Sequence, residues 1–254
     1  MNVSQKDGVT VIQLTGGSAT QSFSREFLPK IRDVILEHIG CKAIVITGEG
    51  RFFSAGADIV AFQESIDEGN SVELIRHLTG ILHPLLLKMR TSETIFVAAL
   101  NGASAGGGLG LALACDARIA SPGGKMAASY SGIGLSPDGG TTWLLPRLVG
   151  EQVARKFFFE NQIWSADEAF ELGAVDEVVA EERLIERAIE VASTWSQWGT
   201  HTKEATKHLL LTQNVNDFET HLKHERTLIE AAGTTPAFAE GIDAFLSKRK
   251  PDFS

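Results

Sequence analysis

The sequence predicts an α/β fold that ends in a helical extension. Short apolar strands alternate with amphipathic helices over the first half of the chain, and a glycine-rich stretch joins a strand to a helix near the middle. After Gly150, helix follows helix. The 254 residues, 43% of them hydrophobic, are enough for one large domain or two small ones.

The first half is predicted to alternate strands with helices. Pro84 is expected to bend or break the helix that contains it, and residues 131–140 are rich in turn formers. The predicted strands are Val9–Leu14, Ala43–Thr47, Ile95–Leu100, Ala117–Ala120 and Lys125–Ala128, and the predicted helices are Ser22–His38, Ser71–Met89 and Gly107–Cys115.

The second half is predicted to be helical, with one strand at Val175–Val179. No repeat or Pro/Ser-rich linker divides it, so we expect the tail to pack on the α/β core. A boundary near Trp195 gives a core of residues 1–195 and a helical region of residues 196–254. The predicted helices are Glu151–Glu160, Ala166–Leu172, Glu182–Trp198, His201–Leu211, Val215–Gly233 and Pro236–Lys248.

Charge and cysteine content narrow the class of protein. Acidic residues exceed basic ones by 32 − 23 = 9, and no run of Lys or Arg is present, so nucleic acid is not an expected partner. Cys41 and Cys115 are far apart and no secretion signal precedes them, so we expect a cytoplasmic protein. The uncharged segment Thr94–Cys115 is long enough to span a membrane, but its five glycines predict strand, loop and buried helix instead.

The glycine-rich stretch Asn101–Gly108 lies between the strand Ile95–Leu100 and a helix. Glycines at a helix start allow unusual backbone angles, and the first N–H groups of the helix are unpaired at the positive end of its dipole. The stretch therefore indicates either an anion site or a close strand–helix contact. It has neither a phosphate-loop lysine nor Gly-x-Gly-x-x-Gly spacing, so nucleotide binding is not indicated.

The same stretch contains Gly102–Gly106, which matches the Gly-x-Ser-x-Gly nucleophile elbow around Ser104. Asp138 or Asp176, followed by His201, would complete a serine-hydrolase triad in the usual chain order. No HGGG-type oxyanion loop precedes the elbow, and a small loop residue is the favoured interpretation of Ser104.

A second loop, Gly50–Asp58, also follows a buried strand and precedes a helix. Two neighbouring loops of this kind could aim two backbone N–H donors at one oxygen atom, which is the geometry of an oxyanion hole. Asp58 is a predicted N-cap of the helix that begins at Ile59. That role is compatible with a donor function of the Ala57 N–H.

Ordered motifs along nearly the whole chain resemble the enoyl-CoA hydratase/isomerase (crotonase) family. The resemblance implies a spiral of ββα units followed by a helical trimerisation region. It also implies binding of acyl-CoA thioesters and assembly as a homotrimer or a dimer of trimers. The motifs are Phe53–Ile59, Asn101–Gly108, Cys115–Ile119, Pro137–Thr141, Leu145–Arg147 and Ala244–Pro251.

The resemblance also assigns residues. The backbone N–H groups of Ala57 and Gly107 would hold the thioester oxygen, and Phe245 and Lys248 would reach the CoA of a neighbouring subunit, although Lys248 alone reads as a solvated charge. No metal is implied, and no cofactor beyond the coenzyme A of the substrate. The other implied contacts to substrate or CoA are Ala55, Asp58, Ile59, Gly106 and Tyr130.

The family's hydratases use two glutamates, and this chain has Gly110 and Tyr130 at those positions. Asp138 remains, in an arrangement that resembles the isomerase-like members, where one acid moves a proton between two carbons. From local sequence alone, Asp138 is a turn former and a candidate N-cap of a helix near Thr141. Tyr130 would position substrate or water, or would be a core aromatic whose hydroxyl reaches the surface.

The leading expectation is an isomerase that converts 3-enoyl-CoA to 2-enoyl-CoA with Asp138 as the proton shuttle. The alternatives are a hydratase that uses Asp138 and Tyr130, a serine hydrolase acting through Ser104, and an acyl-CoA-binding protein without catalysis. The family's N-terminal Asn-Arg-Pro stretch is replaced here by Thr15–Ser22, so the resemblance assigns no CoA contact to this segment.

Overall fold

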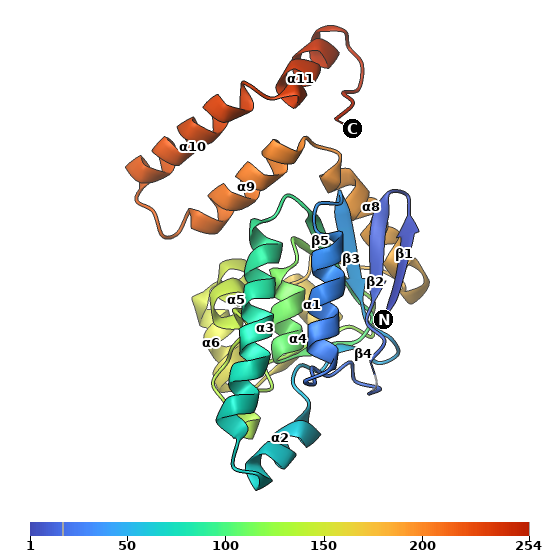
Figure 1. Cartoon of the computed structure of the whole chain (residues 1–254), viewed down its shortest axis with the longest axis vertical. Helices are drawn as coiled ribbons and strands as arrows, with labels where there is room; N and C mark the ends of the chain where they lie inside the picture. Colours follow the sequence, from blue (N-terminus) through green and yellow to red (C-terminus); the bar gives the residue numbers. More distant parts are fainter. Residues whose placement is uncertain (17, 254) are drawn as a thin grey trace.

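The computed structural model describes residues 1–16 and 18–253, which form a layered α/β body with a helical tail (Figure 1). The main sheet has six strands, in the order β1-β2-β3-β5-β7-β10. Only the pair β1–β2 is antiparallel. The strands are β1 (Asn2–Lys6), β2 (Val9–Gln13), β3 (Ala43–Thr47), β5 (Ile95–Leu100), β7 (Ala117–Ala120) and β10 (Glu177–Val178).

A second sheet of four short strands runs in the order β4-β6-β8-β9. Its first three strands are parallel, and β9 is antiparallel to β8. The strands β3, β5 and β7 of the first sheet are each followed by a short strand of the second, and β3-β4-α2 and β5-β6-α4 are complete ββα units. The expected ββα repetition is therefore confirmed. The short strands are β4 (Phe52–Ser54), β6 (Ala103–Ala105), β8 (Lys125–Ala127) and β9 (Ile163–Ser165).

Helices α1, α3 and α4 lie together on one side of the main sheet in Figure 1, and α8 packs on β3 and β5. The helices are α1 (Phe27–His38), α2 (Ile59–Asp67), α3 (Ser71–Thr91), α4 (Gly107–Ala114), α5 (Thr141–Val149), α6 (Glu151–Phe159), α7 (Ala166–Glu171), α8 (Leu184–Ser196), α9 (Thr200–Thr212), α10 (Phe218–Ala232) and α11 (Pro236–Leu246). Short 3-10 turns lie at Ser131–Ile133 and Glu181–Arg183.

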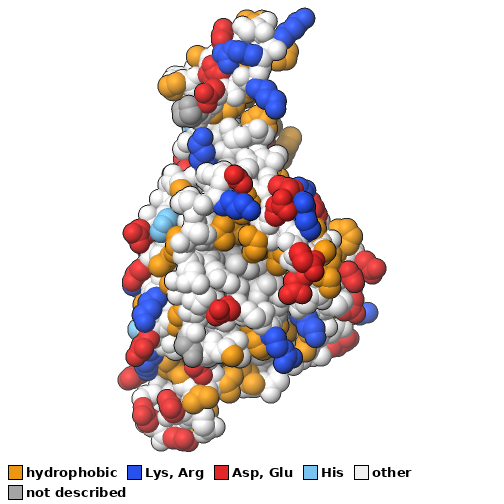
Figure 2. Space-filling model, turned by 90° about the vertical axis from the view of Figure 1, so that its right-hand side faces the viewer, with side chains coloured by type: hydrophobic (Ala, Val, Ile, Leu, Met, Phe, Trp, Pro, Cys, Tyr) orange, Lys and Arg blue, Asp and Glu red, His pale blue; other side chains and the backbone are white. Residues whose placement is uncertain are grey.

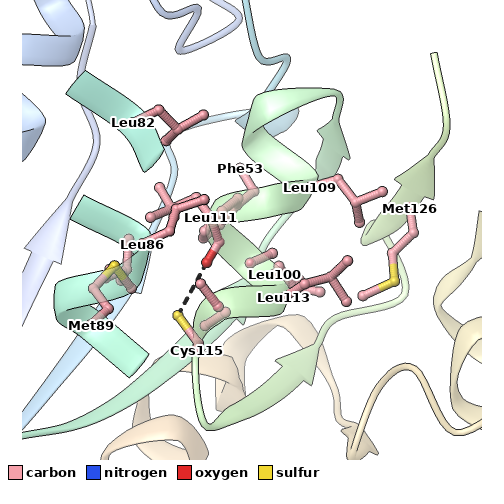
Figure 3. Close-up of a cluster of buried hydrophobic side chains, with 14 of the residues drawn as sticks. Phe53, Leu82, Leu86, Met89, Leu100, Leu109, Leu111, Leu113, Cys115 and Met126 are labelled. Atoms are coloured by element: carbon pink, nitrogen blue, oxygen red, sulfur yellow. Dashed lines mark hydrogen bonds between the residues drawn. The ribbon is translucent and has the colours of Figure 1, made fainter. Parts of the chain in front are cut away.

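The core surrounds α4, every residue of which is buried. Figure 3 shows its Leu111 directed toward Leu86 of α3, and its Leu109 and Leu113 on the other side, toward Met126 of β8. The uncharged segment 94–115 thus forms the predicted strand (β5) and buried helix (α4), and the predicted loop between them contains a further short strand, β6. None of the helices in the described part of the chain has the length and apolar character that a membrane crossing requires.

Asp116, two residues after the end of α4, connects the two ends of this segment. Its Oδ2 accepts a hydrogen bond from the Phe96 N–H at 2.9 Å, and its own N–H donates to the Phe96 carbonyl at 2.8 Å. The buried Lys207 of α9 donates to Asp116 Oδ2 and to the carbonyls of Met89 and Thr94, each at 2.9 Å. Burial lowers the pKa of Lys207, while the charge of Asp116 opposes that shift. The two ends of the segment 96–116 are therefore held together by hydrogen bonds between Phe96 and Asp116. We call this pair of bonds the fastened base of residues 96–116.

The tail presents apolar side chains that its own chain leaves uncovered. Helix α10 has no buried residue, and α11 buries only Ala244. The side view of Figure 2 shows the tail as a narrow projection above a broader body. Helix α9 belongs to the predicted tail, yet its Lys203 and Lys207 are buried against the body. The division into residues 1–195 and 196–254 therefore stays a prediction. The exposed apolar residues of the tail include Phe218, Leu222, Ile229, Phe238, Ile242, Phe245 and Leu246.

Two predicted helices differ from the observed ones. The helix expected from Ser22 begins at Phe27, because Phe23 instead pairs in a β-bridge with Ala57. The helix expected to break or bend at Pro84 is not broken there, because it continues as one element to Thr91. Of the atypical segment Thr15–Ser22, Gly17 lies outside the described residues.

Candidate active site

Two loops meet where neighbouring parallel strands end. One loop follows β3 and the other follows β5, and the side chain of Asn101 ties them together. Its Oδ1 accepts from the Gly48 N–H at 2.8 Å, and its Nδ2 donates to the Gly50 carbonyl at 3.0 Å. A Cβ on Gly56 would lie 2.8 Å from the Gly107 nitrogen. The loops are therefore in main-chain contact, and Gly56 at φ +78° is the residue that allows it.

Each loop supplies one unpaired backbone donor. The bridge between Phe23 and Ala57 uses the carbonyl of Gly56 and the N–H of Asp58, so the Ala57 N–H points away from Phe23. The Gly107 N–H is the first of α4, where no intrahelical partner exists. Among the described residues neither N–H has a hydrogen-bond acceptor, and both residues line one cavity. The pair has the form of the predicted oxyanion hole, with one donor at the positive end of a helix.

The cavity has a volume of about 520 Å³. Of its described lining residues, Asp138 is the only acid. Ala55, Gly106 and Tyr130 also line it. The described residues contain no group of three or more His, Cys, Asp or Glu side chains that could hold a metal. The apolar lining consists of Phe23, Leu28, Phe52, Ile59, Phe62, Ile75, Leu78, Leu82, Ile133 and Leu135.

Tyr130 holds Asp138 at the cavity. The phenol O–H donates to Asp138 Oδ1 at 3.0 Å and lies 3.2 Å from the Asp138 carbonyl oxygen. Burial raises the pKa of Tyr130 well above its usual value, and the negative charge of Asp138 adds to the shift. The phenol therefore stays protonated at neutral pH and remains a donor. One interpretation of the sequence had the hydroxyl of Tyr130 reaching the surface. Tyr130 is instead buried, with its hydroxyl bonded to Asp138.

The interpretation of Asp138 as a helix cap is wrong. The N-cap of α5 is Gly140, and it makes no side-chain capping bond. The main-chain carbonyl of Asp138, not its carboxylate, accepts from the N–H and Oγ1 of Thr141, at 3.2 and 2.9 Å. The carboxylate remains 33% exposed and faces Tyr130 and His83. It is thus free to act on a substrate.

His83 is a neighbour of Asp138 that the sequence analysis missed, although it does not itself line the cavity. It lies on α3, its side chain is 49% exposed, and its Nε2 is 3.4 Å from Asp138 Oδ2. The Gly139 N–H donates to the same nitrogen at 3.4 Å when the imidazole is neutral. No spacing in the sequence links His83 to Asp138, because only the packing of α3 against the turn before α5 brings them together.

Asp58 is the N-cap of α2, as predicted. Its Oδ1 accepts from the N–H groups of Val60 and Ala61 at 2.9 and 3.4 Å. The neighbouring Ile59 lines the cavity, whereas Asp58 does not. A contact between Asp58 and the substrate stays a prediction.

Phe245 and Lys248 are far from this site within one chain. Phe245 is 82% exposed on α11, and Figure 1 places α11 at the end of the molecule opposite α2. Neither residue lines the cavity. Their contact with the CoA of a neighbouring subunit stays a prediction.

The proposed serine-hydrolase triad does not form. Ser104 is fully buried on β6 and donates to the Lys125 carbonyl at 3.0 Å. His201 contacts the Leu228 carbonyl at 2.9 Å in the tail, and Asp176 accepts from the Arg118 N–H at 2.7 Å. Each group is engaged in a different part of the fold, so Ser104 has neither a base nor access to substrate.

An apolar cavity with two unpaired backbone donors and one carboxylate on a ββα spiral defines an acyl-CoA-processing site. The chain belongs to the enoyl-CoA hydratase/isomerase family, whose family model matches residues 4–254. The motifs that indicated this family in the sequence are therefore confirmed.

Individual relatives differ in reaction. The chain is 30% identical to 4-chlorobenzoyl coenzyme A dehalogenase-2 from Arthrobacter sp, over 98% of this chain and 91% of the relative. It is also 30% identical to 1,2-epoxyphenylacetyl-CoA isomerase from Escherichia coli (strain K12), over 97% and 95% of the two chains. The crystal structure of an enoyl-CoA hydratase from Polaromonas sp. JS666 superimposes with a TM-score of 0.91 and 27% identity, covering 99% of this chain and 98% of that one.

Proposed function

We propose that this protein is an enoyl-CoA isomerase that converts a 3-enoyl-CoA to the 2-enoyl-CoA. The supporting observation is the position of Asp138, the only acid among the described residues that line the cavity. Its carboxylate is held by Tyr130 and lies in the same cavity as the Ala57 and Gly107 donors. A double-bond shift needs one group that removes and returns a proton, and this site offers one.

The steps follow from these positions. With the thioester oxygen at the N–H groups of Ala57 and Gly107, Asp138 removes a proton from C2 of the substrate. The electron pair spreads through the dienolate to the oxygen, where the two donors stabilise the charge. Protonated Asp138 then returns the proton to C4, which leaves the double bond between C2 and C3. The proposed steps use no cofactor beyond the coenzyme A of the substrate.

Hydration is the weaker candidate for this site. Addition of water to a conjugated thioester needs a group that activates the water and a group that protonates the α carbon. Here Gly110 and Tyr130 stand at the two glutamate positions of the family's hydratases, and the Tyr130 hydroxyl is committed to Asp138. An acyl-CoA-binding role without catalysis is also the weaker candidate, because the carboxylate of Asp138 faces the cavity instead of capping α5.

The test is a paired assay with 3-hexenoyl-CoA and 2-hexenoyl-CoA in deuterated water, read by NMR and mass spectrometry. Asp138→Asn should lower isomerisation by roughly 10²- to 10⁴-fold, the usual contribution of a general acid–base group. Asp67→Asn, at an exposed carboxylate of α2, is the matched control and should retain wild-type rates. Wild-type enzyme that hydrates 2-hexenoyl-CoA without shifting the double bond of 3-hexenoyl-CoA would refute the proposal.

His83 favours one second candidate, the removal of halide from an aromatic acyl-CoA. A carboxylate can act as a nucleophile, and an imidazole 3.4 Å from it can accept the proton of the water that later hydrolyses the ester. Attack of Asp138 on the ring carbon would release chloride, and hydrolysis would leave a hydroxyl on the ring. The dehalogenase named among the relatives motivates the assay. Release of chloride from 4-chlorobenzoyl-CoA by wild type, lost in His83→Gln, would support this candidate over isomerisation.

We also propose that the chain assembles as a homotrimer or a dimer of trimers through its tail. The uncovered apolar side chains of α10 and α11 support this assembly. Light scattering of the wild type should give three or six chains per particle. Phe245→Ala and Lys248→Ala should raise the KM for acyl-CoA without changing kcat. A monomeric particle with full activity would contradict the assembly.

A further inference from the structure

Two buried glycines face each other beside the proposed site. Gly110 lies inside α4, and Gly139 lies in the turn before α5. A Cβ on Gly110 would lie 2.5 Å from the Gly139 carbonyl oxygen and 3.2 Å from both its carbonyl carbon and its Cα. Such distances are far below ordinary carbon–oxygen contacts, so α4 and the turn touch main chain to main chain.

The turn cannot yield to a side chain at position 110 by a simple rotation. The atoms in the way are backbone atoms, and the turn is fixed by two successive left-handed residues, Gly139 at φ +59° and Gly140 at φ +72°. The Gly139 N–H is directed at His83 Nε2, which ties the turn to α3 as well. Any larger residue at position 110 must therefore displace the whole turn.

Displacement of the turn moves Asp138, which immediately precedes Gly139. The carboxylate and carbonyl of Asp138 both meet the Tyr130 hydroxyl, at 3.0 and 3.2 Å, so the turn sets the position of the proton-accepting oxygen. The proposed function depends on the position of the Asp138 carboxylate, and the inference about Gly110 rests on that proposed function.

We infer that Gly110 determines which reaction this site performs. Because residue 110 has no side chain, the turn seats against α4 and brings Asp138 into the cavity. A side chain at position 110 and Asp138 in its observed position exclude each other. The family resemblance puts a hydratase glutamate at position 110, and in this chain the main chain of Gly139 fills that volume. Restoring the glutamate alone therefore cannot add a second acid to the site.

The experiment uses Tyr130, the only tyrosine of the chain, as a reporter. Protein labelled with ¹³Cζ-tyrosine gives one phenol resonance, which reports the hydrogen bond to Asp138 without substrate. Gly110→Ala must move the turn by about 0.8 Å to restore an ordinary contact, since 3.3 Å is the short end of carbon–oxygen contacts. We expect a shifted phenol resonance and a loss of isomerisation of roughly 100-fold, typical of a misplacement near 1 Å.

The matched control is Gly80→Ala. Gly80 is an exposed glycine of α3, and a Cβ there has no atom within 4 Å. The control should keep the wild-type resonance and rate.

A second variant approaches the contact from the turn and leaves α4 intact. Valine cannot adopt the φ of +59° at position 139 without strain, so Gly139→Val should shift the phenol resonance in the same way. This variant carries the test if thermal unfolding shows that Gly110→Ala does not fold. Gly110→Glu should show no hydration of crotonyl-CoA above wild type.

Three results would overturn the inference. One is a phenol resonance in Gly110→Ala and Gly139→Val that matches the Gly80→Ala control. Another is isomerisation by Gly110→Ala within twofold of wild type, and the third is rapid hydration by Gly110→Glu. If wild type isomerises nothing, the proposed function fails, yet the tyrosine resonance still decides whether Gly110 seats the turn.

Discussion

Gly56 separates the two main-chain donors of the proposed oxyanion hole, and replacing it tests that arrangement. In Gly56→Ala the new Cβ would lie 2.8 Å from the Gly107 nitrogen and 2.6 Å from the Ala105 carbonyl oxygen. Ordinary contacts begin near 3.3 Å, so the loops must separate by about 0.5 to 0.7 Å. An oxyanion donor acts within about 2.7–3.1 Å of the oxygen, so a separation of this size removes roughly one donor.

The expected cost is large and specific. Loss of one donor lowers kcat by about 10²- to 10³-fold, or about 2.7–4 kcal/mol of transition-state stabilisation. The left-handed backbone of Gly56, at φ +78°, costs an alanine roughly 1–2 kcal/mol of folding stability in addition.

Gly50→Ala separates these two effects. Gly50 has φ +65° in the same loop, but a Cβ there meets no atom within 4 Å. Both variants should lower the midpoint of thermal unfolding, whereas only Gly56→Ala should lose kcat in the isomerisation assay. Equal kcat values for the two variants would refute the assignment of Ala57 and Gly107 as paired donors.

Three further predictions concern residues around the site. Ser104→Ala should cost about 1 kcal/mol of stability, the worth of one hydrogen bond, and leave kcat within twofold of wild type; a larger loss of kcat would revive the nucleophile hypothesis. Lys207→Met breaks a buried ion pair and should lower the free energy of unfolding in urea by about 3–5 kcal/mol. The control Lys223→Met, in an exposed ion pair, should change this free energy by less than about 0.5 kcal/mol. Equal losses in the two variants would contradict the role of the buried network. Burial raises the pKa of the Cys115 thiol to about 12, so at pH 8 it stays protonated. A thiol reagent should then modify only Cys41 in native protein and both thiols after unfolding; two native reactive thiols would contradict this.

The elements with strong hydrophobic patterns were predictable, and those that depend on partners were not. Strand β5 and helix α4 form where the apolar segment indicated them. Strand β1 is exposed at every residue and carries no alternation, although Asp7 and Gly8, both at positive φ, form the turn that an Asp-Gly pair signals. The three-residue strands β4 and β6 form by pairing with each other across 50 residues, for which no local pattern exists.

The candidate site was predictable where a motif carried it. The loops around Ala57 and Gly107 were indicated by small residues between strand and helix, and the structure places both donors at one cavity. The local pattern around Asp138 indicated a cap, and only the tertiary structure shows that its carboxylate contacts Tyr130 instead of capping α5. Nothing in the sequence joins His83 to Asp138 across the 54 residues between them, because their contact is purely tertiary.

The fastened base of residues 96–116 determines when the chain loses conformational freedom. Asp116 makes two hydrogen bonds to the main chain of Phe96, one through its carboxylate and one through its own N–H. Lys207 of α9 donates a further hydrogen bond to the Asp116 carboxylate. Gly107 therefore sits near the apex of a closed ring whose ends cannot drift apart. The conformational entropy of the Gly107 N–H is lost when the protein folds and not when a thioester binds. Orienting this donor therefore takes little from the free energy of substrate binding.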